Sequence, residues 1–236
     1  MSMRINNINS PAAYYSKAQE PAIRDNYKKL SSGKKINSAK DDAAGLAISE
    51  KMLSAINKAN KEIENYQDEK SMLNVSDSMY SGTNDYLMDM YSQAVRSSSS
   101  LLSDDDRQVL TDYMSELKKD AASMLETTRF NEMKVADKNA AKNLPSDFDI
   151  STIKDSINSF NAIRSKDGAR YNGLEHRIAN KEAEAINTTA AVSRIADTEY
   201  GSAVSELNRN RTLETYRYQM QNRQMQDANN SVTGLF

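Results

Sequence analysis

The chain lacks cysteine and tryptophan, and it has few of the residues that break helices. Its 236 residues include 0 Cys, 0 Trp, 3 Pro and 7 Gly. Without a thiol the chain can form no disulfide framework, thiolate metal site or cysteine nucleophile. With so few Pro and Gly residues there is little to divide the chain into short strands, so the composition predicts long helices.

Long apolar runs and an excess of one charge are also missing. The chain has 31 basic and 33 acidic residues, a formal net charge of -2 that disfavours a nucleic acid partner. No run of about 18 apolar residues predicts a membrane span. The start MSMRINNINS lacks the apolar core of a secretory signal, so we expect no cleaved signal peptide. A cytosolic protein and export by another route both fit.

Apolar residues recur at helical spacing from Leu46 to about Arg96. They are Leu46, Leu53, Ile56, Ile63, Tyr66, Leu73, Met79, Leu87, Met90 and Ala94. At about 1.5 Å per residue this predicts an amphipathic helix of roughly 75 Å, which needs a partner along its length. Gly82 is a candidate kink or break within it.

Four further segments complete a predicted rod over residues 46–199. Ser103, followed by three aspartates, predicts the N-cap of a second helix that runs to about Thr128. Residues 129–150 predict a loop with at most one weak hairpin. Ser151 opens another helix, which residues 166–168 close or bend. A third long helix then starts near Ala169, with Leu174, Ile178, Ala185, Val192 and Ile195 on one heptad seam.

The terminal segments, residues 1–45 and 200–236, are polar and helical in tendency. They carry too few apolar residues to bury a core of their own, so we expect them to fray in isolation and to order on association. The simplest packing is antiparallel and places the two segments side by side. The fold class predicted is therefore mainly all-α: a long antiparallel helical rod bundle with coiled-coil-like terminal helices and at most a small β-hairpin.

A bend joins the first terminal segment to the rod, in the stretch LSSGKKINSAKDDAAGLAIS from Leu30 to Ser49. Gly33 can adopt a positive φ that ends a helix, and Ser38 or Asp41 can cap the next one, with Asp42 adding favourable charge at its start. Small residues follow, which would let another backbone come close. They are Ala43, Ala44, Gly45 and Ala47.

This bend resembles the amino-terminal region of bacterial flagellin, the subunit of the flagellar filament. The matching positions are Leu30, Ser31, Ser32, Gly33, Ile36, Asn37, Ser38, Ala39, Asp41, Asp42, Ala43, Ala44, Gly45, Leu46, Ala47, Ile48 and Ser49. Further segments are similar to flagellin, so that about three quarters of the chain is covered. They are MRINNINS, SDDDRQVL, TTRFN, GLEHRI, SRIADTEY and MQDANN.

The resemblance implies a structural subunit that polymerises into a filament for swimming motility. The two termini would pair as coaxial helices around a central channel, inside a wall made of the rods. It implies an assembly joint at Leu30, Ser32, Gly33, Ile36, Asn37, Asp41, Asp42, Ala44 and Gly45. It implies terminal assembly contacts at Ile5, Tyr14, Leu207, Leu213, Tyr216, Met220, Met225, Ala228 and Asn229.

The resemblance also implies an extracellular place in the flagellum and a set of partners. Family members are exported unfolded through the flagellar type III apparatus, and a chaperone is expected to hold the helix at residues 201–236. Filament cap and hook-associated proteins are further partners. The family's surface for an innate immune receptor usually carries Arg and Leu four residues apart. Here Asp89 and Gln93 take those places, so we expect weak recognition.

Two other positions depart from the family pattern. Pro21 falls inside the first terminal segment, where it kinks a helix or marks its start. Glu132 follows Asn131 where the family often has Gly, so the family pattern does not predict the conformation of the turn after RFN.

Enzymatic and cofactor sites are not indicated. His176 is the single histidine, and a zinc protease helix would need two in the pattern HExxH. The run Asp104–Asp106 lacks the alternating ligands of a calcium loop and fits a helix start better. We therefore expect no enzyme, metal or cofactor. The alternatives to flagellin are a hook-filament junction protein, which shares the end helices, and a coiled-coil adaptor module.

Overall fold

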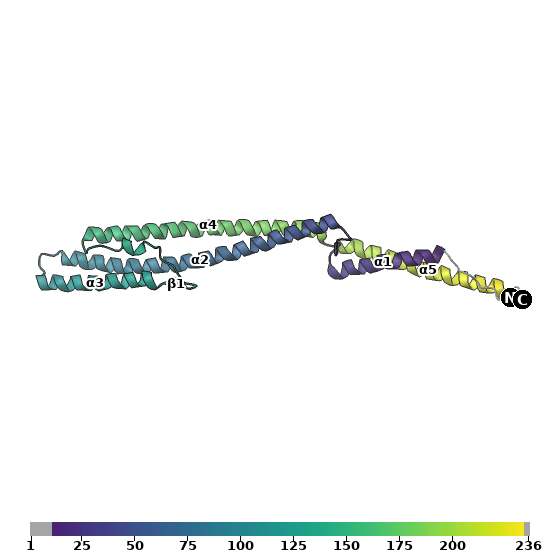
Figure 1. The fold of residues 1–236 in the computed structure, drawn as a ribbon, viewed down its shortest axis with the longest axis horizontal. Helices are drawn as coiled ribbons and strands as arrows, with labels where there is room; N and C mark the ends of the chain where they lie inside the picture. Colours follow the sequence, from purple (N-terminus) through teal and green to yellow (C-terminus); the bar gives the residue numbers. More distant parts are fainter. Residues whose placement is uncertain (1–10, 234–236) are drawn as a thin grey trace. The chain divides into compact units, whose positions relative to one another are not determined.

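The computed structural model describes residues 11–233, with side chains described for residues 20–227 and for Asn230. Within this part the chain is almost entirely helical (Figure 1). The helices are α1 (Pro11–Ser32), α2 (Ala43–Ser97), α3 (Asp104–Thr127), α4 (Ile150–Ala196) and α5 (Tyr200–Thr233). A hairpin of β1 (Arg129–Phe130) and β2 (Met133–Lys134) and the 3-10 helix η1 (Ala140–Asn143) lie between α3 and α4. The all-α expectation with a small hairpin is confirmed.

The contacts divide the chain into two units. The first combines Met1–Ile56 with Ile186–Phe236, and the second is Asn57–Ala185. No helix within residues 11–233 is both long and apolar enough to cross a membrane.

The second unit packs α2, α3 and α4 side by side around its own apolar core (Figure 1). Tyr80 and Phe160 lie at its centre with ring centroids 5.7 Å apart, and both side chains are almost wholly buried. The Tyr80 hydroxyl accepts a hydrogen bond of 3.1 Å from the backbone N–H of Asp137. The loop before η1 is thereby fixed to the core, where Ala136 and Ala140 are also buried.

Polar pairs set the register between α2 and α4 in this unit. The ion pairs are Asp77 with Arg164 (2.7 Å), Lys70 with Glu175 (2.9 Å), Glu69 with Arg170 (2.5 Å) and Glu62 with Lys181 (2.9 Å). Two hydrogen bonds between side chains also join these helices: Ser76 donates to Asp167 (2.8 Å) and Asn84 donates to Asn161 (2.7 Å). The two helices are antiparallel, and a slip of one turn would separate all these pairs. Because most of these groups are partly exposed, the pairs specify register more than they add stability.

The long helices run through the points where the sequence predicted interruptions. α2 does not break at Gly82. A Cβ there would lie 2.9 Å from Met124 Sδ, so this glycine makes room for α3. The predicted end at residues 166–168 and new start near Ala169 are wrong, because α4 is one helix of 47 residues. Each glycine costs about 1 kcal/mol in a helix, and the packing of α4 on α2, which buries Leu174, outweighs this cost at Gly168.

Pro21 does not start the first terminal helix. The structure describes α1 from Pro11 onward, and Pro21 lies within it. Of the two alternatives for Pro21, a kink in this helix or its start, the start is therefore wrong.

Candidate assembly joint and terminal helices

The bend after α1 is tied to the junction between α4 and α5. Gly33 has a φ of 70°, the left-handed conformation that glycine adopts without strain, and it ends α1 as the sequence predicted. Its carbonyl accepts a hydrogen bond of 2.8 Å from the N–H of Thr198. The N–H of Lys35 donates to the carbonyl of Ala196, also at 2.8 Å. Two short segments far apart in the sequence therefore form an isolated antiparallel bridge.

Side chains of the predicted joint support this bridge. Ser32 Oγ accepts a hydrogen bond from the N–H of Lys34 (3.1 Å), and the Asn37 amide donates to the Lys34 carbonyl (2.7 Å). The carbonyl of Leu30 accepts a hydrogen bond from the Tyr200 hydroxyl. The first two bonds close the turn on itself, and the third ties the end of α1 to the start of α5.

The two aspartates of the joint have different roles. Asp41 Oδ2 accepts hydrogen bonds from the Ser38 hydroxyl (2.9 Å) and from the N–H of Asn37 (3.0 Å). The bond from Ser38 is the main reason that the pKa of Asp41 lies below its usual range. Asp42 Oδ1 accepts from the N–H of Gly45 (2.8 Å), which makes Asp42 the N-cap of α2. The prediction that Ser38 or Asp41 caps this helix is wrong, because those two side chains are already bonded to each other.

The small residues at the start of α2 do not bring a second backbone close within the chain. Gly45 is buried, and a Cβ built on it would lie 2.3 Å from Asp42 Oδ2 and 2.7 Å from Ile36 Cδ1. Gly45 thus makes room for the capping carboxylate and for Ile36, whose side chain is buried. Ala44 is exposed and has no such role in the single chain.

Helices α1 and α5 pair along each other, as the sequence predicted for the two terminal segments (Figure 1). The Arg211 guanidinium hydrogen-bonds to the Tyr27 hydroxyl and lies 5.3 Å from the centre of its ring. Among the described side chains of the two helices, three are buried: Asn26, Ala203 and Leu207. The described side chains therefore make little apolar contact between these helices.

Most of the predicted assembly residues on α5 are exposed. Leu207 is buried in the pair, whereas Leu213 (39%), Tyr216 (66%), Met220 (53%) and Met225 (49%) are exposed to solvent. Tyr200, Val204 and Tyr218 are exposed as well. Ile5 lies outside the described residues, and so do the side chains of Tyr14, Ala228 and Asn229. We call Leu213, Tyr216, Met220 and Met225 the α5 stripe.

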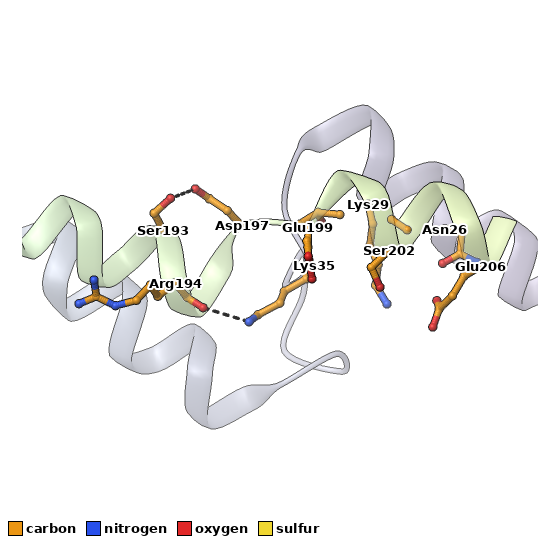
Figure 2. Close-up of a pocket in the computed structure, with 11 residues that line it drawn as sticks. Asn26, Lys29, Lys35, Ser193, Arg194, Asp197, Glu199, Ser202 and Glu206 are labelled. Atoms are coloured by element: carbon orange, nitrogen blue, oxygen red, sulfur yellow. Dashed lines mark hydrogen bonds between the residues drawn. The ribbon is translucent and has the colours of Figure 1, made fainter.

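A cavity of about 560 Å³ lies beside the bridge, lined by α1, the turn after it and the α4–α5 junction (Figure 2). Lys35 Nζ crosses one side to donate to the carbonyl of Arg194 (3.1 Å). Lys29 is paired with Asp25 at 2.7 Å, and the hydrogen bond that Lys29 donates to that carboxylate raises the pKa of Lys29. The charges that line the cavity are mixed in sign, and no set of three or more metal-ligating side chains occurs among the described residues.

Two polar groups of this cavity were not found from the sequence. Asn26 is 5% exposed, and the Oγ1 atom of Thr198 is buried without a hydrogen-bond partner. The sequence holds no signal for them, because they lie more than 150 positions apart and meet only through the bridge.

The remaining positions singled out from the sequence lie in the second unit. Gln93 donates to Asp89 Oδ1 (3.3 Å), and the Tyr113 hydroxyl donates to Asp89 Oδ2 (3.1 Å), which raises the pKa of Tyr113. The turn after Phe130 puts Asn131 (φ 47°) and Glu132 (φ 65°) in the left-handed region. Asparagine tolerates this conformation, while Glu132 occupies a position where glycine is favoured.

Comparison with known proteins finds similarity along most of the chain. The bacterial flagellin N-terminal helical region matches residues 5–141, and the bacterial flagellin C-terminal helical region matches residues 150–236. A flagellin from Halalkalibacterium halodurans is 32% identical over 221 residues, which cover 78% of this chain and 81% of the other. The flagellar filament 31.3 kDa core protein of Treponema maltophilum is 28% identical over 235 residues, 78% of this chain and 82% of the other. A Clostridium tyrobutyricum flagellin is 39% identical over 135 residues, 57% of this chain and 33% of that longer one. Because both helical regions match in order and each supplies one of the two bridged segments, the chain belongs to the bacterial flagellin family.

Proposed function

We propose that this flagellin polymerises by ordering α1 and α5 against the terminal helices of neighbouring copies, with the α5 stripe buried in the contact. As a member of its family the chain is a structural subunit of the bacterial flagellar filament and assembles with copies of itself. Burial of the α5 stripe between copies would make that assembly favourable. On this proposal residues 1–45 and 200–236 form a terminal domain that orders on polymerisation, and residues 46–199 form the rod.

The observation that carries the proposal is the exposure of the α5 stripe. Its four side chains are between 39% and 66% exposed in the single chain. Fully burying a large apolar side chain contributes about 1.5 to 3 kcal/mol, and these are roughly half exposed, so the stripe would contribute about 3 to 6 kcal/mol per copy. Only three of the described side chains of the α1–α5 pair are buried, which gives little apolar burial to offset the entropy lost when the pair is ordered. The contribution of neighbouring copies therefore decides whether the pair is ordered.

Polymerisation by such a contact needs no enzymatic step. A contact between different surfaces of identical copies that does not close on itself generates an open helical polymer. We expect no catalytic activity, and an assay for hydrolysis should give only background.

The partners expected for a flagellin follow from the same surfaces. We propose an extracellular place in the flagellum, reached through the flagellar export apparatus. An export chaperone would cover the α5 stripe before assembly, and filament cap and hook-associated proteins would contact the terminal helices. Recognition by the innate immune receptor should be weak, because the Asp89 carboxylate is held by Gln93 and Tyr113. Strong signalling by the purified monomer in a receptor reporter assay would contradict this.

Seeded elongation tests the proposal directly. Purified protein is added to short filament seeds, and the critical concentration is measured by sedimentation and electron microscopy. Tyr216→Ser with Met220→Ser should raise it at least about tenfold, since removing about 1.4 kcal/mol of contact has that effect. The matched control is Met133→Ser with Ile186→Ser, two apolar side chains that are 60% and 68% exposed outside α5. Equal elongation by the two double variants would refute the role of the stripe.

A further inference from the structure

A basic groove lies on the first unit, on the side of α1 that carries Pro21. It encloses about 490 Å³ and is lined by Pro21, Arg24, Asp25, Lys28 and Lys40. The Asp25 carboxylate is taken by Lys29, at 2.7 Å. Lys28 and Lys40 are exposed, and neither makes an ion pair with any side chain that the structure describes. The groove therefore offers two unpaired ammonium groups.

The acidic residues near the groove in the sequence form no ion pair with Lys28 or Lys40 among the described side chains. The charge of Lys40 acts on the neighbouring Asp41 carboxylate, but both hydrogen bonds to Asp41 Oδ2 come from Ser38 and Asn37. Arg24 is paired with Glu20 at 3.0 Å, and both of those side chains are more than 60% exposed, where such a pair contributes little. The aliphatic stems of Arg24 and Lys28 add apolar surface to the groove.

The turn between α2 and α3 has the complementary properties. Leu101 is 94% exposed, the highest value among the large hydrophobic side chains that the structure describes. Asp104 and Asp105 are exposed in the first turn of α3 and have no ion pair within the described part of the chain. The nearby Arg107 forms no ion pair with them, and its guanidinium donates to the carbonyls of Ser97, at the end of α2, and of Ser99, in the turn, both at 2.8 Å.

We propose that the turn at residues 101–105 of one copy docks into the Lys28–Lys40 groove of a second copy. Two carboxylates face two ammonium groups, and Leu101 packs on Pro21 and the lysine and arginine stems. An apolar side chain surrounded by unpaired charge is the usual composition of a specific contact, in which the charges select the partner and the orientation. The proposal rests on the proposed function, since it names one contact of the same polymer.

The contact joins two different surfaces, so it is head-to-tail. A groove on one copy and a turn on the next leave a free groove and a free turn at the two ends of any chain of copies, which is the requirement for open growth. Screening weakens such pairs, and elongation should therefore become slower as salt is raised from 0.05 to about 0.5 M.

Charge reversal in seeded elongation tests the contact. Lys28→Glu with Lys40→Glu should raise the critical concentration about tenfold, and Asp104→Lys with Asp105→Lys should do the same. The variant with all four changes should recover most of the loss, because the signs are complementary again. The matched control is Lys138→Glu with Lys142→Glu, which changes the net charge equally at two exposed, unpaired lysines and should elongate normally. Circular dichroism checks that each variant keeps its helices.

Cross-linking then identifies the two surfaces. The chain has 0 Cys, so Lys28→Cys with Leu101→Cys introduces the only thiols. Mild oxidation of filaments should give a ladder of covalent multimers on a denaturing gel, while oxidation of dilute monomers should not. A disulfide within single chains would refute the contact between copies.

The outcomes separate this contact from the proposed function. If the unmodified chain fails to elongate seeds, polymerisation itself is refuted. If the unmodified chain and both charge-reversal variants elongate alike, only this contact is refuted. A four-change variant that stays as impaired as its parents would also refute the pairing of these two surfaces.

Discussion

Replacing Gly45 by alanine measures how tightly the joint after α1 is closed. The new Cβ would lie 2.3 Å from Asp42 Oδ2 and 2.7 Å from Ile36 Cδ1, distances at which something must move. Asp42 can rotate away only by giving up the cap on the N–H of Gly45, and Ile36 is 6% exposed and surrounded. Both responses weaken the start of α2.

The magnitude follows from three opposing effects. Alanine favours a helix over glycine by about 1 kcal/mol. Loss of the N-cap costs about 1 kcal/mol, and inserting a methyl group into a closed contact costs roughly 1 to 3 kcal/mol. The net expectation is a destabilisation of the joint by about 1 to 3 kcal/mol.

Gly173 supplies a control of the opposite sign. It also lies in a helix, α4, but a Cβ there would meet nothing within 4 Å. Gly173→Ala should therefore stabilise the protein by about 0.5 to 1 kcal/mol through helix propensity alone. The same chemical change is thus expected to act in opposite directions at the two positions.

Urea unfolding followed by circular dichroism gives the overall effect, and amide hydrogen exchange of the peptide 43–56 gives the local one. Local exchange is needed because a chain of two units need not unfold in a single step. Faster exchange at the start of α2 in Gly45→Ala, with slower or unchanged exchange there in Gly173→Ala, is the expected result. Stabilisation by Gly45→Ala equal to that by Gly173→Ala would refute the close packing of the joint.

Three further substitutions test single local features. Ser103→Ala removes the capping box of α3 and should cost about 1 kcal/mol by urea unfolding. The hydrogen bond from the Ser103 hydroxyl lowers the pKa of Asp106 in the folded protein. The contribution of this bond to stability is therefore complete above the pKa that Asp106 has in the unfolded chain, and it is lost as the pH falls through the lower pKa of the folded protein. This acid-side loss should be smaller in the variant, and an unchanged acid titration would contradict the role of the cap. Glu132→Gly relieves a φ of 65° and should stabilise the hairpin by about 1 kcal/mol, seen as slower amide exchange; no change there would show an unstrained turn. Thr198→Val removes a buried hydroxyl without a partner and should leave stability equal or raise it by up to about 1 kcal/mol; a clear loss in urea unfolding would mean that the hydroxyl is bonded.

Features that depend on neighbouring residues could be predicted from the sequence. The helical spacing from Leu46 onward predicts α2, and Ser103 with its aspartates predicts the cap that begins α3. The short apolar runs after Thr128 predict the small hairpin. Each of these signals lies within a few residues of the structure that it causes.

Features that depend on contacts between distant parts of the chain could not be predicted from the sequence. Gly168 indicates an interruption of α4 when only the cost of the glycine itself is counted. The packing on α2 that outweighs this cost comes from residues about 100 positions away, such as Asp77 opposite Arg164. The joint itself was predicted from its glycine and aspartates. Its bridge to Ala196 and Thr198, however, has no signature in either segment.

The most direct test of the account compares amide exchange in the terminal helices before and after polymerisation. The account predicts that amides of Pro11–Ser32 and Tyr200–Thr233 exchange rapidly in dilute monomer, while those of the second unit are protected. In filaments the same terminal amides should slow about a thousandfold, which corresponds to roughly 4 kcal/mol of added stability. Full protection of both helices in the monomer, or rapid exchange that persists in filaments, would contradict it.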